Sequence, residues 1–288
     1  MPKSARNRQL AKQHARRQAE RRQRQRRRQT TTIAIALVVA LVGSLAVFLA
    51  FTGGDEPPPA ASAPTGPTAS SGPTGSDEPG AQTGTVQPEP GPEQVACGAA
   101  QPRTALRPKP QFSSPAEVVE RGDIPVVEIQ TSCGTVVVRL LADRAPETVN
   151  SFVFLAQQKY FDGQRFHRLD TSLDVVQGGD PTGRGDGGPG YSIPDELTGD
   201  EIYEAGLLAM ANAGPDTGGS QFFFVTGPGA SGLPPSYTIF GRVIEGMDVL
   251  ELIQGLPVQD PEAAAAGDIG AQAPAEAVYI EKVTIAQE

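Results

Sequence analysis

Two polar side chains stand out in the stretch RFHRLDTSLDVVQGGDP, residues 165–181. The stretch alternates apolar and polar residues, as half-buried strands do, and carries Arg168 and Gln177 on expected neighbouring strands. An arginine on a barrel strand is usually solvated or salt-bridged, so Arg168 alone indicates no chemistry. Together with Gln177 it would supply fixed hydrogen-bond donors at one place.

A second stretch, GLLAMANAGPDTGGSQFFFVTG at residues 206–227, joins an apolar run to three phenylalanines through a glycine-rich turn. A plain core strand needs neither an asparagine nor a glycine cluster, whereas a binding surface can use both. Asn212 offers polar groups on a strand able to pair with an extended peptide. Phe223 and Leu233 would wall an apolar slot. Beside Arg168, this pattern indicates an uncleaved peptide held against an arginine, next to a slot of proline size.

Other motifs do not point to a different chemistry. GRGDGG, residues 183–188, matches a dinucleotide-binding pattern, but PGYSIPDE follows it and cannot start the required helix cleanly. We interpret it as a loop that shapes a groove. His167 has no G-x-S-x-G partner motif for a hydrolase triad and is interpreted as structural. We expect no metal and no cofactor.

The elements that would position these residues are mostly short strands. A strand–turn–strand unit is predicted at 125–141, and helices at 143–160 and 246–254. Further strands are predicted at 165–169, 174–178, 206–212, 221–226, 238–244 and 277–285. Many short strands with two helices favour an antiparallel barrel or sandwich. The loop at 255–275 is expected to be mobile and functionally silent.

The N-terminal region is basic and then apolar. Twelve of the 24 Lys and Arg residues lie in residues 1–28, while residues 33–51 contain no charge and no proline. Nineteen helical residues span roughly 28 Å, close to the hydrocarbon thickness of a bilayer. A cleaved signal peptide is the alternative, disfavoured by the long basic region and by a poor cleavage site. We predict a basic arm (1–30) and a transmembrane helix (31–52).

The charge distribution predicts the orientation of this helix. Lys and Arg precede the apolar segment and are absent from residues 53–92, which follow it, and this places the N-terminus in the cytoplasm. We therefore expect a single-pass plasma-membrane protein whose folded domain is extracellular. The basic arm has no aromatic residue for base stacking, so nucleic acid is not an expected partner.

A segment rich in proline and glycine separates the apolar segment from the folded part. Residues 53–92 hold ten prolines and eight glycines with no basic or aromatic residue, a composition typical of a disordered linker. We assign 53–115 to linker and lead-in, and 116–288 to the folded domain. Outside the membrane a disulfide between Cys97 and Cys133 is permitted, with two free thiols as the alternative.

The folded domain resembles the cyclophilin-type peptidyl-prolyl cis-trans isomerases. The motifs that carry the resemblance are FHR at 166–168, QGGDP at 177–181, MANAGPDTGGSQFF at 210–223 and YTIFGRVIEGMDVLELI at 237–253. The likeness covers residues 120–288 approximately, and the anchored layout is similar to that of actinobacterial members. It implies a closed eight-stranded antiparallel β-barrel capped by two helices, and a monomer that acts on proline-containing polypeptides.

The resemblance also assigns roles to residues. It implies a catalytic group and a substrate-binding group: Arg168, Gln177 and Phe223 for the first, and Val175, Ala211, Asn212, Gln221, Leu233 and Tyr237 for the second.

Three positions depart from the family pattern. The aromatic expected in the loop after Arg168 falls on Leu173 or Asp174, and this loop is one residue longer than in eukaryotic members. Tyr237 stands in place of the pocket histidine. Gly232 lies nearest the position of a tryptophan that supports cyclosporin binding, so weak cyclosporin sensitivity is expected.

The resulting hypothesis is an X-Pro isomerase that assists the folding of exported proteins. Arg168 would stabilise a twisted amide without a covalent step. One rival is a membrane-tethered module that binds proline peptides with little catalysis. Another is an inert envelope scaffold, which would bind no proline peptide.

Overall fold

The computed structural model describes residues 78–92 and 94–287. The expected basic arm, the apolar segment 31–52 and residues 53–77 of the expected linker lie outside the described residues. No helix within the described ranges is long and apolar enough to cross a membrane.

Eleven strands and three α-helices make up the described part of the chain. The strands are β1 (Gln82–Val86), β2 (Lys109–Phe112), β3 (Pro125–Thr131), β4 (Gly134–Leu140), β5 (Arg165–Phe166), β6 (Arg168–Asp170), β7 (Val175–Gly178), β8 (Leu207–Met210), β9 (Phe222–Val225), β10 (Ile239–Glu245) and β11 (Val278–Gln287). The α-helices are α2 (Pro146–Gln157), α3 (Met247–Gln254) and α4 (Pro261–Ala265), and the 3₁₀ turns are η1 (Ala96–Gly98), η2 (Pro228–Gly232) and η3 (Gly270–Gln272).

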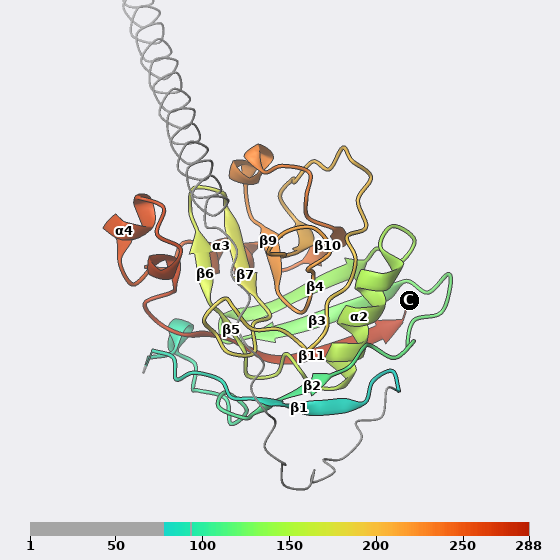
Figure 1. Cartoon of the computed structure of the whole chain (residues 1–288). Helices are drawn as coiled ribbons and strands as arrows, with labels where there is room; N and C mark the ends of the chain where they lie inside the picture. Colours follow the sequence, from blue (N-terminus) through green and yellow to red (C-terminus); the bar gives the residue numbers. More distant parts are fainter. Residues whose placement is uncertain (1–77, 93, 288) are drawn as a thin grey trace, which may run out of the picture. The chain divides into compact units, whose positions relative to one another are not determined.

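Nine of these strands form one antiparallel sheet that curls into a nearly closed barrel (Figure 1). Their order is β5-β11-β3-β4-β10-β8-β9-β7-β6. The two outermost strands, β5 and β6, are consecutive in the chain and separated only by His167. They are two halves of one broken strand, which explains why nine strands are found where eight were expected. The break lies where pairing changes from β11 to β7.

Strand β9 serves two apolar clusters, because successive side chains of a strand point to opposite faces. Phe222 and Phe224 belong to the main core, which fills the barrel, whereas Phe223 and Val225 belong to a second cluster on the outer face. All four are buried. The continuous FFFV run is therefore a strand covered on both faces, and the outer cover is the site described below.

The two expected helices are present, and the structure adds a third. Helix α2 begins with Pro146 in its first turn, and the Glu196 carboxylate accepts hydrogen bonds from the first free backbone N–H groups, those of Glu147 (3.0 Å) and Thr148 (2.9 Å). Helix α3 contacts β4 and β7. The third helix, α4, lies in the segment 255–275.

The expectation for segment 255–275 is wrong in one respect: it is not a featureless loop. Asp260 caps α4 by accepting hydrogen bonds from the N–H groups of Glu262 and Ala263. Val258 pairs with Pro274 at the base of the segment, and η3 follows α4 (Figure 1). We call residues 258–274 the α4–η3 excursion.

Part of the segment expected to be linker and lead-in is ordered. Strands β1 and β2 pair with each other, and Phe112 of β2 is buried in the main core with its ring edge-on to Phe154 (centroids 5.0 Å apart). Pro189 accepts a hydrogen bond from the Phe112 N–H. A strand that is exposed along most of its length, as β1 is, carries no apolar alternation by which the sequence could identify it.

A disulfide links the lead-in to the barrel. Cys97 in η1 is bonded to Cys133, which lies in the tight turn between β3 and β4. The backbone beside it is tied as well, because Ala96 N–H donates to Ala277 O at 3.0 Å. The lead-in is thus fixed to the barrel at both the β2 and the η1 ends.

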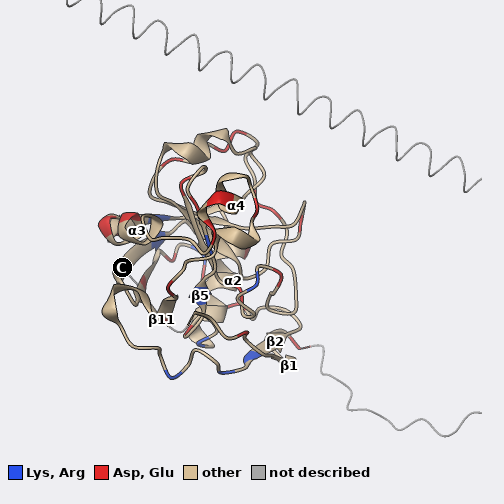
Figure 2. Ribbon diagram, turned by 90° about the vertical axis from the view of Figure 1, so that its left-hand side faces the viewer, with Lys and Arg blue, Asp and Glu red and all other residues tan. Residues whose placement is uncertain are grey.

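The domain surface is acidic rather than basic. Figure 2 shows acidic residues on α3 and α4 and on several loops, with Lys and Arg scattered. Beyond residue 28 the chain has 12 basic and 32 acidic residues. The part of the chain beyond residue 28 therefore carries a net negative charge.

Replacing both Cys97 and Cys133 with alanine should destabilise the domain. The disulfide closes a loop with a sequence separation of 36, and loss of such a link costs about 3–4 kcal/mol of unfolding free energy in the chain-entropy account. Denaturant unfolding followed by circular dichroism measures the effect. Reductant should lower the midpoint of the wild type but not of the variant, and equal midpoints for oxidised wild type and variant would contradict the prediction.

Candidate active site

Strand pairing places three expected site residues in one row across the sheet. Arg168 of β6 lies opposite Gln177 of β7, and Gln177 lies opposite Phe223 of β9. Directly opposed residues of antiparallel strands point to the same face. That face is the outer one, because Phe223 belongs to the second cluster while Phe222 and Phe224 belong to the main core.

A cavity of about 260 Å³ opens on this face. Its wall contains eight of the nine expected site residues: Arg168, Val175, Gln177, Ala211, Asn212, Phe223, Leu233 and Tyr237. The ninth, Gln221, lines an adjoining cavity of about 280 Å³ that shares Gln177, Ala211 and Asn212 with the first. The two cavities form one groove, and the Ala211–Asn212 segment lines both parts of it.

The first cavity has an aromatic floor. Phe223 is 4% exposed, and its ring meets that of Tyr237 edge-on with centroids 5.4 Å apart. The buried Tyr203 hydroxyl donates to Tyr237 O (3.0 Å) and accepts from Tyr237 N–H (2.9 Å). Tyr237 is therefore fixed through its backbone, and its ring provides apolar surface where the family pattern has a histidine.

Asn212 presents its backbone rather than its side chain to the groove. Its Nδ2 donates to Ser236 O (2.7 Å) and to Asp195 Oδ1 (3.2 Å), so the amide is occupied in fixing the loop. Neighbouring Ala211 donates its N–H to Gln221 O at 2.9 Å, which continues the strand pairing. The backbone N–H and C=O of Asn212 have no partner among the described residues. They are free to pair with an extended peptide.

The Arg168 guanidinium is held by three acceptors, one for each nitrogen. Nε donates to Gln272 Oε1 (2.7 Å), Nη1 to Gln177 Oε1 (3.2 Å) and Nη2 to Asp170 Oδ2 (2.7 Å). An arginine carries five N–H groups. One N–H on each of Nη1 and Nη2 is therefore left without a partner among the residues that the structure describes. Arg168 is partly exposed, so these groups can reach a ligand in the cavity.

Asp170 also holds the loop that follows it. Its Oδ1 accepts hydrogen bonds from Ser172 N–H, Ser172 Oγ and Leu173 N–H. Burial alone would raise the pKa of the Asp170 carboxyl, but these hydrogen bonds and the Arg168 charge outweigh it and lower the pKa. Asp170 is thus charged near neutral pH and anchors both Arg168 and the pocket loop.

A relay of side-chain amides fixes the orientation of Gln177. The Gln221 NH₂ donates to the carbonyls of Gly185 (3.0 Å) and Gly187 (2.9 Å). Because carbonyls only accept, Gln221 must turn its oxygen toward Gln177, whose NH₂ donates to it at 3.0 Å. The Gln177 oxygen is then left facing Arg168. The glycine loop at 183–188 shapes the groove, as expected, and also aligns the arginine.

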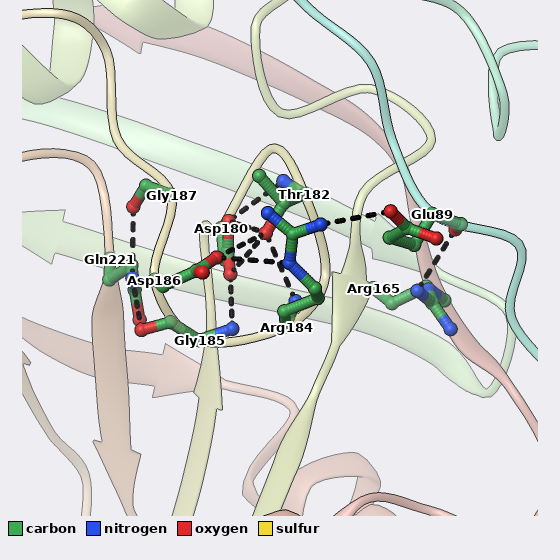
Figure 3. A network of polar contacts seen from close by, with 9 residues as sticks. All are labelled: Glu89, Arg165, Asp180, Thr182, Arg184, Gly185, Asp186, Gly187 and Gln221. Atoms are coloured by element: carbon green, nitrogen blue, oxygen red, sulfur yellow. Dashed lines mark hydrogen bonds and ion pairs between the residues drawn. The ribbon is translucent and has the colours of Figure 1, made fainter.

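Figure 3 shows how this glycine loop is held. The buried Asp180 carboxylate accepts hydrogen bonds from Thr182 N–H (2.7 Å) and from Gly185 N–H. A Cβ at Gly187 would clash with Asp180 Oδ1, so a larger residue there would have to displace this hydrogen-bonded carboxylate. Glu89 of the lead-in reaches the loop from outside through an ion pair with Arg184 (2.9 Å), exposed at both ends and therefore weak.

Leu173 and Asp174 take different roles in the loop between β6 and β7, where the sequence departs from the family pattern. Leu173 lines the cavity, in the region where the family pattern has an aromatic. Asp174 does not line it, because its carboxylate accepts from Gly229 N–H (2.7 Å) and its carbonyl accepts from Thr226 N–H (2.8 Å). Asp174 thus ties two loops together outside the pocket. Gly232, at the end of η2, adds no side chain to it.

His167 is a structural residue at the break between β5 and β6. Its backbone N–H donates to Gln177 O at 3.0 Å, and its ring nitrogens are shielded from solvent. Burial lowers the pKa of His167 to about 4, opposed by the charge of Asp180 and aided by the charges of Arg165 and Arg168. The imidazole is therefore neutral near pH 7, which suits it to packing rather than to proton transfer.

Sequence reasoning missed four residues of the site: Asp170, Tyr203, Ile269 and Gln272. Asp170 could have been found, since it lies two residues from Arg168 on the same strand face. Gln272 and Ile269 lie in a stretch rich in alanine and glycine, with no periodicity that would bring them to Arg168. No group of three or more potential metal ligands occurs within the described ranges.

Comparison with known proteins agrees with this geometry. The family described as cyclophilin type peptidyl-prolyl cis-trans isomerase/CLD matches residues 126–285. The probable peptidyl-prolyl cis-trans isomerase B of Mycobacterium tuberculosis is 41% identical over 179 residues, 57% of this chain and 54% of that protein. Human peptidyl-prolyl cis-trans isomerase-like 1 is 43% identical over 147 residues, 47% of this chain and 87% of that protein.

A solved structure shows the same fold. The crystal structure of a Cryptosporidium parvum cyclophilin-type peptidyl-prolyl cis-trans isomerase matches with a TM-score of 0.50 and 29% sequence identity, over 58% of this chain and 99% of that one. The chain belongs to the cyclophilin-type peptidyl-prolyl cis-trans isomerases. Its cyclophilin domain runs from β3 to β11. The chain spans about half the length of the M. tuberculosis relative.

Replacing His167 with glutamine should change how the stability of the cyclophilin domain depends on pH. The pKa of His167 is about 4 in the folded state against an ordinary value of 6.5. Between these values the unfolded chain binds more protons, so the free energy of unfolding falls as the pH drops through this window. Between pH 7 and 4 the wild type should lose up to about 3 kcal/mol of unfolding free energy through His167. The H167Q variant should lack that loss. Urea unfolding at pH 4 to 7 tests this, and parallel profiles would contradict it.

Proposed function

We propose that the chain catalyses cis–trans isomerisation of X-Pro bonds in extended polypeptide segments. The observation that carries the proposal is the Arg168 guanidinium, which is fixed by three acceptors and faces an apolar cavity. Two of its N–H groups have no partner among the described residues. Family membership and the names of the relatives support the same reaction.

Amide resonance sets the physical problem. Rotation about a peptide bond meets a barrier of about 18–20 kcal/mol, and before proline both isomers are populated and exchange in tens to hundreds of seconds. The reaction breaks no covalent bond, so no nucleophile or general base is required. A catalyst has only to bind the twisted amide more strongly than either planar isomer.

Arg168 meets this requirement. Twisting the amide localises a lone pair on the prolyl nitrogen, which accepts a hydrogen bond that the planar amide nitrogen accepts poorly. A free N–H of Arg168 donates that bond, because a guanidinium carries only hydrogen-bond donors and no acceptor. Because three acceptors already fix the group, little reorganisation accompanies the twist.

The rest of the groove holds the substrate on either side of the bond. Phe223, Val175 and Leu233 enclose the proline ring, and the free backbone groups of Asn212 pair with the neighbouring segment. The part of the peptide paired with Asn212 stays fixed while the rest turns. Gln177 and Gln221 support the arginine and the groove wall.

The proposed setting follows from the N-terminal sequence. Residues 31–52 would anchor the chain in the plasma membrane with the basic arm in the cytoplasm, and the cyclophilin domain outside would act on exported proteins as they fold. The Cys97–Cys133 disulfide is compatible with an oxidising compartment. We propose a monomer, without cofactor, metal or nucleic-acid partner.

Arg168→Ala should abolish most of the activity. We expect kcat/KM for a short X-Pro peptide to fall roughly 10²–10³-fold, the range for loss of one preorganised donor. The assay uses the full chain in mild detergent and follows cis-to-trans conversion of the peptide. Arg242→Ala is the matched control, because Arg242 is an exposed arginine on β10 outside the groove.

One outcome of this assay would contradict the proposed reaction, and another would contradict the proposed mechanism. A folded wild-type chain that binds X-Pro peptides without isomerising them would favour the tethered binding module. Full activity in Arg168→Ala would leave isomerisation in place but remove the proposed mechanism.

The proposed orientation can be tested with fusions of a phosphatase that is active only outside the cytoplasm. A fusion after residue 115 should be active, and replacing the Lys and Arg residues of 1–28 with neutral residues should reduce that activity, because these charges retain the N-terminus in the cytoplasm. An inactive fusion in the unaltered chain would overturn the orientation.

A further inference from the structure

The α4–η3 excursion leaves the barrel after α3 and returns to β11. Its base is closed by the Val258–Pro274 pair and by the hydrogen bond from Gln259 N–H to Ala273 O at 2.8 Å. Helix α4 contains no buried residue, and most of the excursion is exposed. The exception nearest the site is Gln272, only 5% exposed.

Gln272 is directed at the catalytic arginine. Its Oε1 accepts the hydrogen bond from Arg168 Nε at 2.7 Å, and η3 contacts β6. Gln177 and Asp170 alone hold the guanidinium at its two terminal nitrogens, so it could still tilt about the line that joins them. A third contact, at Nε, fixes the plane of the group. That plane determines where the two free N–H groups point.

The same turn carries an apolar side chain to the rim of the cavity. Gln272 N–H donates to Ile269 O at 3.2 Å, which closes η3. Ile269 lines the first cavity although the residue is 62% exposed. A substrate residue next to the proline would cover this exposed surface.

We propose that the α4–η3 excursion is part of the active site, with Gln272 as a positioning residue for Arg168 and Ile269 as a specificity-determining residue. This inference rests on the proposed isomerase function. It assigns to residues 258–274 a role in the rate and in the choice of substrate.

The role of Gln272 is tested in the full chain with an X-Pro peptide. Gln272→Ala should lower kcat about tenfold and change KM less than about twofold, because the arginine acts on the twisted state rather than on the bound ground state. Gln272→Glu keeps an acceptor oxygen and should retain activity within about threefold of wild type. Gln259→Ala is the matched control, since Gln259 lies at the base of the same excursion, away from Arg168.

A double-mutant cycle separates positioning from general support of the fold. In the Arg168→Ala background, Gln272→Ala should cause no further loss. Equal losses in both backgrounds would show a purely structural role, and wild-type activity in Gln272→Ala would overturn the inference directly. An inactive wild type would instead refute the proposed function.

The role of Ile269 is tested with peptides that differ only in the residues flanking proline. Wild type should favour a large apolar residue over alanine on one flank, and Ile269→Ser should lose several-fold of that preference through KM. Ile124→Ser is the control, because Ile124 is an exposed isoleucine just before β3. An unchanged preference on both flanks in Ile269→Ser would contradict this part of the inference.

Discussion

The site depends on one constraint: a guanidinium must be held rigidly while part of it stays free. Arg168 satisfies it with three acceptors from three places, Asp170 on its own strand, Gln177 on the adjacent strand and Gln272 from the excursion. Each uses one N–H, so two of the five donors of the arginine have no partner among the described residues. A lysine could not replace it, because an ammonium has three donors and no fixed plane.

The barrel provides the frame for this constraint. Cross-strand register places Arg168, Gln177 and Phe223 in a row, so the donor, its support and the pocket floor keep their spacing as long as the sheet holds. Packing on both faces of β9 locks that register, because a one-residue slip would exchange the side chains of the two clusters. Loops supply the remaining contacts. The carbonyls of Gly185 and Gly187 orient Gln221, and Gln272 accepts the hydrogen bond from Arg168 Nε.

The sequence was informative where motif and strand pattern coincide. Arg168 pairs with Gln177, and both line one cavity with Ala211, Asn212 and Phe223, which agrees with the placement expected from FHR, QGGDP and the 210–223 stretch. It was uninformative where function depends on a long-range contact without a pattern. Gln272 lies 104 residues from Arg168 in a stretch with no alternation, and only the fold brings them together. The exposed strand β1 was missed for a similar reason, because its pairing with β2 leaves no apolar periodicity.

The most direct test of the mechanism measures binding and turnover of one peptide in the same experiment. Two-dimensional NMR exchange with an X-Pro peptide gives both the Kd and the cis–trans exchange rate on the protein, for wild type and for Arg168→Ala. If Arg168 stabilises mainly the twisted amide, the exchange rate should fall by roughly two orders of magnitude or more, while the Kd changes less than about twofold. A Kd that rises by the same factor as the loss of activity, with an unchanged rate for the bound peptide, would contradict the account.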